Sequence, residues 1–215
     1  DIITLDKEGR LTKVFGGAIA LHPAQIVNKE LSMVQKQELQ TTEKQAIARY
    51  AASLIEPDDC VYLDAGTTTG WMIEYIRQEK ATYITNALSH AKRLADKGFS
   101  VILIGGEPKS STDAIVGGEA VLNLQKYHFS KGFFGVNGVD RLSGFTTPDV
   151  KEAVVKQAAV KNTQPAHRYF LTTSSKFGEV YAVTFAGFEG GTILTEDNVS
   201  EVLPKSIEII NVTQQ

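Results

Sequence analysis

Short apolar segments alternate with longer amphipathic ones along most of this chain. Runs of strand length cover residues 61–63, 81–85, 100–104 and 133–136, and shorter ones follow at 169–172, 182–185, 191–194 and 207–210. Between them, apolar residues recur at helical spacing and predict helices ending near residue 79 and covering 89–97 and 149–162. Such alternation predicts an α/β fold, a mostly parallel sheet with helices on both faces.

The first forty residues follow a different pattern. A polar turn at 6–9 separates the apolar stretches 2–5 and 11–14, which predicts a hairpin that ends at Gly16-Gly17. Residues 21–40 are polar and contain Pro23, so we expect a linker or a loosely attached helix. A helix then begins near Thr42, where Thr42 and Gln45 fit a capping box, and Pro57 ends it. The predicted organisation is a stub over 1–20, a linker over 21–40 and one domain over 41–215.

Composition narrows the class of protein. The chain has 215 residues, of which 42% are hydrophobic and 22% charged, with a net charge of −3. This balance predicts no general attraction to nucleic acid or acidic membranes. No apolar run approaches the ~20 residues that span a bilayer. The single cysteine, Cys60, excludes an internal disulfide, and we expect a buried thiol in a cytoplasmic protein. The first residue is Asp, so we expect the sequence to begin inside a longer gene product.

One loop has the composition of an anion site. Gly66-Thr67-Thr68-Thr69-Gly70 follows a predicted strand and opens a predicted helix. A helix start offers unpaired N–H groups and partial positive charge, glycine lets the backbone approach a ligand, and hydroxyls donate to phosphate oxygens. A threonine cap in a tight turn is the alternative. The loop is neither a Walker A loop nor a dinucleotide fingerprint, which argues against ATP and NAD.

Other predicted strands also end in polar or glycine residues. Because the carboxyl ends of parallel strands share one edge, these residues are expected to line a pocket with the threonine loop, although each alone is compatible with a turn. Glu152 lies in the first turn of a helix, and Lys176 is able to place an ammonium on a phosphate. The four dispersed histidines suggest no metal site. The strand-end candidates are Asp64, Asn86, Gly105, Gly106, Gly135, Asn137 and Asp140.

Together these stretches resemble the effector-sensing domain of DeoR-type bacterial transcriptional repressors. The resemblance runs over about residues 45–210, and residues 1–17 are similar to the end of that family's winged helix-turn-helix module, whose recognition helix is absent here. The matching stretches are Gly16-Gly17, 63–69, 84–86, 104–106, 135–140, 144–149 with Glu152, and 174–178.

The resemblance implies a fold like that of ribose-5-phosphate isomerase and glucosamine-6-phosphate deaminase. It also implies roles: Gly66, Thr67, Thr68, Thr69 and Lys176 would hold a phosphate, and Asp140 and Glu152 would face a sugar. The isomerases carry Asp-Gly-Ala-Asp where this chain has Asn137-Gly-Val-Asp140, and they carry a catalytic lysine with no clear counterpart between Asp140 and Glu152. Since Asn cannot exchange a proton near neutral pH, we expect binding without turnover.

A second departure concerns the family itself. Many members carry Asp immediately before Ser-Ser-Lys, where this chain has Thr173. That difference either alters which sugar is recognised or exchanges one capping group for another.

Three functions remain open at this point. The first is a sensor that binds a phosphorylated sugar (fructose 1-phosphate or tagatose 6-phosphate as first guesses), needs no cofactor, and modulates operator binding through the absent DNA-binding module in a homo-oligomer. The second is a sugar-phosphate isomerase or deaminase with Glu152 as base. The third is a dimerisation module without a ligand.

Overall fold

A computed structural model describes residues 3, 11–14, 17–20, 25–27, 33–199, 203–204 and 207–214. Within the first segments, β1 (Leu11–Val14) pairs antiparallel with β2 (Gly17–Ala20). The strand at 11–14 is confirmed and pairs with 17–20; the predicted turn at 6–9 and, apart from Ile3, the predicted strand at 2–5 lie outside the described residues.

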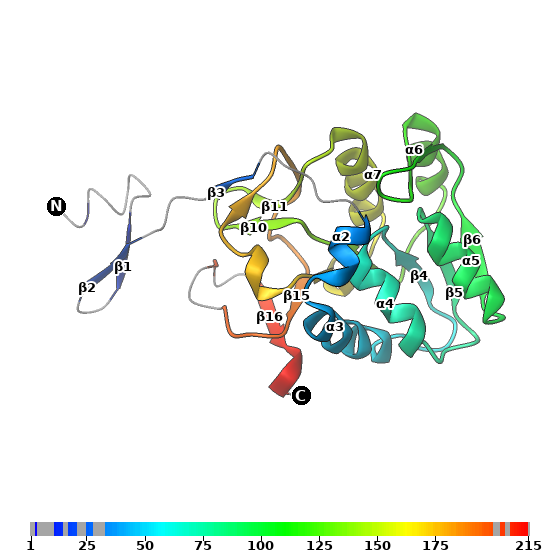
Figure 1. The fold of residues 1–215 in the computed structure, drawn as a ribbon, viewed down its shortest axis with the longest axis horizontal. Coiled ribbons are helices and arrows are strands. Elements are labelled where there is room, and N and C mark those ends of the chain that lie inside the picture. Colours follow the sequence, from blue (N-terminus) through cyan, green and yellow to red (C-terminus); the bar gives the residue numbers. More distant parts are fainter. Residues whose placement is uncertain are drawn as a thin grey trace.

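A seven-stranded parallel sheet forms the centre of the molecule (Figure 1). Its order is β16-β15-β12-β9-β4-β5-β6, and every neighbouring pair is parallel, which confirms the predicted fold class. The strands are β4 (Cys60–Leu63), β5 (Thr82–Thr85), β6 (Ser100–Leu103), β9 (Lys131–Gly135), β12 (Arg168–Leu171), β15 (Thr192–Thr195) and β16 (Glu208–Asn211).

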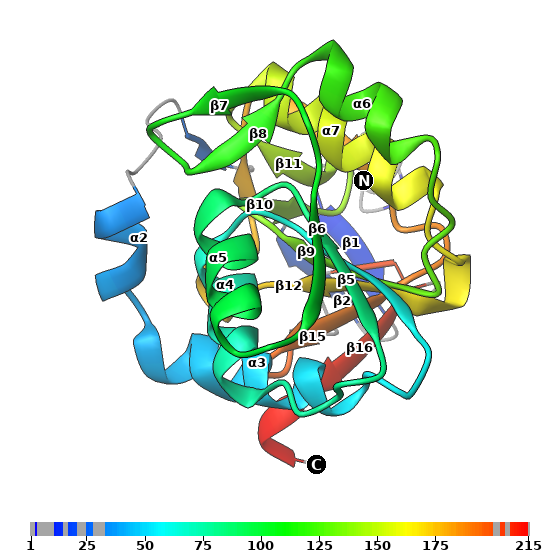
Figure 2. The ribbon, with the colours of Figure 1, turned by 90° about the vertical axis from the view of Figure 1, so that its right-hand side faces the viewer.

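Helices cover both faces of this sheet (Figure 2). A separate hydrophobic core lies between the sheet and each layer of helices. Successive strand residues point to opposite faces, so Val61 and Leu63 join one core while Tyr62 joins the other. The first core packs against α3 (Thr41–Ser53), α4 (Thr67–Tyr75) and α5 (Leu88–Asp96), and the second against α6 (Gly118–Leu124) and α7 (Val150–Lys161).

Smaller sheets and short helices complete the fold. A hairpin joins β7 (Glu107–Lys109) to β8 (Ala114–Val116), and β3 (Gln25–Ile26) pairs with β13 (Glu179–Val180). A three-stranded antiparallel sheet contains β10 (Gly138–Asp140), β11 (Gly144–Thr147) and β14 (Val183–Ala186). Residues 182–185 therefore form a strand as predicted, but outside the central sheet. The 3-10 helices are η1 (Pro165–His167), η2 (Ser174–Lys176) and η3 (Val212–Gln214).

One helix cap and one helix end differ from those predicted. Gln40 caps α3 in a left-handed conformation, with φ 51° and no side-chain cap, so Thr42 lies inside the helix and the predicted capping box is wrong. The next helix ends at Tyr75 rather than near residue 79. In the predicted linker, α2 (Met33–Glu38) is a short helix directly before Gln40.

The strand order reverses between β4 and β9, since β5 and β6 follow on one side and the later strands on the other. In such open α/β sheets, ligands bind beyond the carboxyl ends of the strands at this reversal. No helix in the described ranges is long and apolar enough to cross a membrane.

Candidate functional site

The threonine loop lies at the reversal, between the end of β4 and the start of α4. Its N–H groups belong to the first turn of a helix, where no helical carbonyl precedes them. Thr69 is fully buried and donates its hydroxyl to the carbonyls of Asp64 (2.7 Å) and Gly66 (3.0 Å), so it stabilises the loop itself. Thr67 and Thr68 line the cavities described below. Both interpretations of the sequence therefore apply: Thr69 stabilises a tight turn, while Thr67 and Thr68 lie at a cavity.

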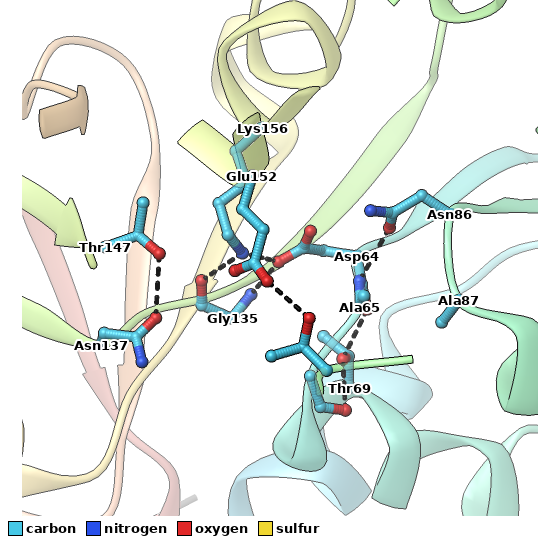
Figure 3. Close-up of polar contacts among 12 residues, drawn as sticks. Asp64, Ala65, Thr69, Asn86, Ala87, Gly135, Asn137, Thr147, Glu152 and Lys156 are labelled. Atoms are coloured by element: carbon cyan, nitrogen blue, oxygen red, sulfur yellow. Dashed lines mark hydrogen bonds and ion pairs between the residues drawn. The ribbon is translucent and has the colours of Figure 1, made fainter. Parts of the chain in front are cut away.

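A buried ion pair joins β4 to α7 beside this loop (Figure 3). The Lys156 ammonium contacts Asp64 Oδ2 and donates to the Gly135 carbonyl at 3.0 Å, while the Gly135 N–H donates to Asp64 Oδ2 at 3.0 Å. Burial raises the pKa of the Asp64 carboxyl, and the Lys156 ammonium opposes that effect. Asp64 Oδ1 is buried and has no hydrogen-bond partner among the described residues. Asp64 therefore holds the two strands of the reversal together.

Asn86 fixes the other side of the loop. Its Oδ1 accepts the Ala65 N–H at 2.8 Å (Figure 3). The same oxygen accepts the Tyr62 hydroxyl at 3.0 Å, and Nδ2 donates to the Ile115 carbonyl at 3.3 Å. With a side chain 2% exposed, Asn86 is engaged with protein groups at both ends. The geometry gives Asn86 the role of positioning the Ala65 peptide.

Glu152 lies at the start of α7 and is shared with the β7–β8 hairpin. Its Oε1 accepts the Thr112 hydroxyl at 2.6 Å and the Lys109 ammonium at 3.0 Å. Asp149 caps the same helix by accepting the Glu152 N–H at 3.0 Å, and it also pairs with Lys109. The carboxylate is thus oriented from two directions. Asn137, at the end of β9, accepts the Thr147 hydroxyl at 3.2 Å (Figure 3).

Two adjoining cavities open at these residues. They share Thr67, Thr68, Val136, Asn137 and Lys36 in their walls. The inner cavity, of about 60 Å³, is completed by Ala65, Gly66, Thr112, Gly135, Glu152 and Lys156. The lysine cavity, of about 70 Å³, is completed by Leu39, Gln40, Lys44, Leu171, Thr172, Thr173, Lys176 and Tyr181. Cations thus lie along both parts of the combined space, with Lys44 and Lys176 at the lysine cavity, Lys156 at the inner cavity and Lys36 at both, and the inner cavity adds the Glu152 carboxylate.

Three lysines line the lysine cavity. Lys36 comes from α2, Lys44 from α3 and Lys176 from η2. Burial, together with the charges of Lys176 and Lys36, lowers the pKa of Lys44 to about 8, and Glu43 opposes the shift. Lys176 pairs with Glu179 at 3.5 Å. A cluster of like charges around a polar cavity favours a multiply charged anion.

A third cavity, of about 280 Å³, lies on the other side of Thr67. Its walls include Trp71, His90 and Arg93. Burial, together with the Arg93 charge, lowers the pKa of His90 to about 4, so this imidazole is neutral at pH 7. Arg93 already pairs with Glu74 at 2.9 Å.

Six of the sequence candidates do not line these cavities: Asp64, Thr69 and Asn86 lie behind the walls, and Gly105, Gly106 and Asp140 lie apart from them. Asp140 accepts the N–H groups of Leu142 (3.0 Å) and Ser143 (2.9 Å) and so caps the turn between β10 and β11. Gly106 has φ 146°, and a side chain there would meet the Val116 carbonyl at 2.7 Å, so glycine allows β8 to approach. Gly105 lies beside Asn123.

Sequence reasoning missed several residues of the site. Lys156 carried a signal: residues 152, 155, 156 and 159 share one helical face and are all buried, while Val154 on another face is 44% exposed. A Glu and a Lys within the apolar stripe of a helix predict a buried charge pair. Lys36 and Lys44 carried no comparable signal, and neither did Lys109 and Thr112 of the hairpin. Among the residues that the structure describes, no group of three His, Cys, Asp or Glu is arranged to hold a metal ion.

Comparison with known proteins shows which family this chain resembles. A model described as the DeoR C terminal sensor domain matches residues 39–198. The uncharacterized HTH-type transcriptional regulator FruR of Bacillus subtilis (strain 168) is 43% identical over 92% of this chain and 77% of its own length. The lactose phosphotransferase system repressor of Staphylococcus aureus (strain N315) is 36% identical over 97% of this chain and 82% of its own.

Solved structures with a similar fold include an isomerase and a chain of eIF2B. Ribose 5 phosphate isomerase A from Neisseria gonorrhoeae has a TM-score of 0.46 and 13% identity, covering 67% of this chain and 55% of that one. The eIF2B delta chain from Chaetomium thermophilum has a TM-score of 0.46 and 18% identity, covering 67% and 52%. The match spans about half the length of each of these solved chains.

Proposed function

This chain belongs to the DeoR C-terminal sensor domain family, and we propose that it binds a phosphorylated sugar as the effector of a sugar-responsive transcriptional repressor. One observation carries the proposal: three lysines from three different elements meet the threonine loop at one cavity. Each ammonium supplies up to three donors, and the start of α4 adds N–H groups, so a phosphate dianion satisfies the whole cluster.

The inner cavity fits the sugar part of such a ligand. The side chains of Asn137 and Glu152 reach its wall, and an amide and a carboxylate both hydrogen-bond hydroxyl groups. We therefore place the phosphate at Thr67, Thr68 and Lys176 and the sugar hydroxyls at Asn137 and Glu152. Thr69, Asp64 and Asn86 support the walls from behind, by the contacts given above.

Binding without turnover is the second part of the proposal. The relatives reported above are named as regulators and repressors. Support within the site comes from Asn137, which cannot act as an acid, and from Glu152, whose Oε1 is occupied by Thr112 and Lys109. Incubation with ribose 5-phosphate or glucosamine 6-phosphate tests this directly, and formation of ketose product or release of ammonia would establish an enzyme instead.

The effector class is tested by thermal unfolding with paired ligands. Fructose 1-phosphate and tagatose 6-phosphate are compared with fructose and tagatose, each over a concentration series. A ligand at 100 times its Kd stabilises the folded chain by ~2.7 kcal/mol. We expect a shift with a phosphosugar and none with its parent; no shift with either phosphosugar contradicts this effector class.

A residue test separates specific binding from general charge. Lys176→Ala removes one cation from the lysine cavity, whereas Lys92→Ala removes an exposed cation of α5 that pairs with Asp96. We expect Lys176→Ala to lower phosphosugar affinity at least about tenfold and Lys92→Ala to leave it unchanged. Equal losses in the two variants would show that the phosphate does not lie at Lys176.

The remaining parts of the proposal concern the whole repressor. We propose that residues 1–20 end a DNA-binding module, that residues 21–40 connect it to the sensor over 41–215, and that the chain acts in the cytoplasm as a homo-oligomer on operator DNA. The family relationship supports this assignment. Gel-shift titration of the longer protein on operator DNA, with and without the effector, tests it.

A further inference from the structure

The junction between α2 and α3 has an unusual backbone. Gln40 separates the two helices with φ 51° and ψ 46°. A residue other than glycine is strained by ~1 kcal/mol or more in this left-handed region and stays there only when its surroundings hold it. The contacts that hold Gln40 are therefore informative.

The Gln40 side chain is held by the loop that carries Lys176. Its Oε1 accepts the Thr173 hydroxyl at 2.9 Å and the Ser175 hydroxyl at 3.0 Å. Both donors flank the first residue of η2, and Lys176 ends that helix. A movement of the Lys176 loop is thus transmitted directly to the α2–α3 junction.

A second connection runs through Lys44. Its ammonium donates to the carbonyls of Leu39, at 2.7 Å, and Lys36, so it fixes the end of α2 against α3. A lysine has three donors, so one is left for a ligand in the lysine cavity that Lys44 also lines. Burial lowers the pKa of Lys44, and the nearby charges of Lys176 and Lys36 lower it further, so these two cations oppose the charged form of Lys44.

We propose that Gln40 is the positioning residue through which an anion in the lysine cavity fixes the linker helix α2. This inference rests on the proposed function. An anion between Lys44 and Lys176 removes their mutual repulsion and draws both toward one point. Thr173 and Ser175 then hold Gln40, and Lys44 holds the carbonyl end of α2. The helix that leads toward residues 1–20 is consequently held more firmly with ligand than without it.

The role of Thr173 follows from the same contact. Its hydroxyl donates to Gln40 Oε1, an acceptor to which a side chain without a proton to donate could not bond. Thr173 thus supplies a specific connection between the loop that carries Lys176 and the linker.

Amide hydrogen exchange of the chain, followed by mass spectrometry, tests the proposal. Exchange over residues 33–40 is compared with and without a saturating concentration of the phosphosugar that gives the larger thermal shift. Thr173→Val removes the hydroxyl at nearly constant volume. Gln40→Gly removes the side chain and keeps the left-handed backbone at no cost. Thr184→Val is the matched control, since Thr184 lies on β14 and donates its hydroxyl to the Ser143 carbonyl, away from the lysine cavity.

In the wild type and in Thr184→Val we expect ligand to slow exchange over 33–40 about tenfold. Because Thr173 and Gln40 line the lysine cavity, we expect weaker but saturable binding in Thr173→Val and Gln40→Gly, with that slowing lost when each variant is saturated. A wild-type thermal shift without slower exchange overturns this inference alone, and so does slowing that persists in both variants, or failure of both to bind. No thermal shift in the wild type overturns the proposed function as well.

Discussion

The ion pair between Lys156 and Asp64 makes a demanding prediction. Replacing Lys156 by Met keeps much of the side-chain volume and removes the ammonium. Asp64 then remains in a site where its side chain is 1% exposed, with the Gly135 N–H as its one polar partner in the described part of the chain. The substitution also leaves the Gly135 carbonyl without the donor that it has at 3.0 Å.

The expected magnitude follows from the burial of both groups. Their side chains are 5% and 1% exposed, so solvent screens neither. Removing one partner of a buried pair costs about 3–5 kcal/mol, because the other charge stays uncompensated. A domain of this size is stable by roughly 5–15 kcal/mol, so Lys156→Met is expected to be folded but close to its limit.

The deficit also has a pH signature. Without Lys156, burial raises the folded-state pKa of Asp64 far above its unfolded value, so the folded chain binds a proton that the unfolded chain releases. Stability is then lost as pH rises, by ~1.4 kcal/mol per unit between the two pKa values. The variant is therefore expected to be closer to wild type at pH 5 than at pH 8.

Urea unfolding followed by circular dichroism measures both effects. Lys92→Met serves as the control, because the Lys92–Asp96 pair is exposed and contributes ~0.5 kcal/mol or less. Adding Asp64→Asn to Lys156→Met removes the uncompensated charge, and we expect it to restore at least about 2 kcal/mol. A Lys156→Met loss under ~1 kcal/mol, or no recovery in the double variant, would refute the reasoning.

Three further predictions concern the loop and the cavities. Burial and the charges of Lys176 and Lys36 lower the pKa of Lys44 to about 8, and a bound dianion raises it, so binding takes up a proton. Calorimetry should therefore show phosphosugar affinity about tenfold lower at pH 9 than at pH 7; an affinity that does not change with pH contradicts this. Asn86→Ala leaves two buried donors without an acceptor and should cost about 2–3 kcal/mol of unfolding free energy; a loss under ~0.5 kcal/mol argues against its positioning role. Asp140→Ala should weaken a turn by ~1 kcal/mol and change phosphosugar affinity less than about twofold; a tenfold affinity loss would place Asp140 at the sugar.

The sequence predicted the central sheet because each of its strands is a short apolar run between amphipathic segments. Residues 182–185 have the same pattern but lie in the antiparallel sheet. The hydrophobic pattern of a short strand does not show which of two sheets it joins. The hairpin of β7 and β8 was missed because neither strand exceeds three residues. The capping box at Thr42 failed because a tertiary contact, Thr173 to Gln40, sets the helix start.

The sequence indicated the candidate site at the contiguous threonine loop and at residues near strand ends and helix starts, such as Asn137, Glu152 and Lys176. The threonine loop is one stretch of chain, so its chemistry can be read directly. The lysine cavity combines side chains that are far apart in the sequence, from residue 36 to residue 176, and nothing local indicates that they meet. Lys156 is an intermediate case, because its place on the same helical face as Val155 and Ala159 indicates burial, although nothing in the sequence names Asp64 as its partner.

The lysine cavity also bears on which phosphate compounds compete for this protein. Three ammonium groups recognise charge and geometry of a phosphate but not what the phosphate is attached to. Inorganic phosphate has the same charge and geometry, so it would compete for this cavity. If the phosphosugar binds as proposed, its preference over inorganic phosphate comes from hydroxyl contacts at Asn137 and Glu152. The concentration at which the sensor responds would therefore vary with the phosphate status of the cell as well as with the supply of its sugar.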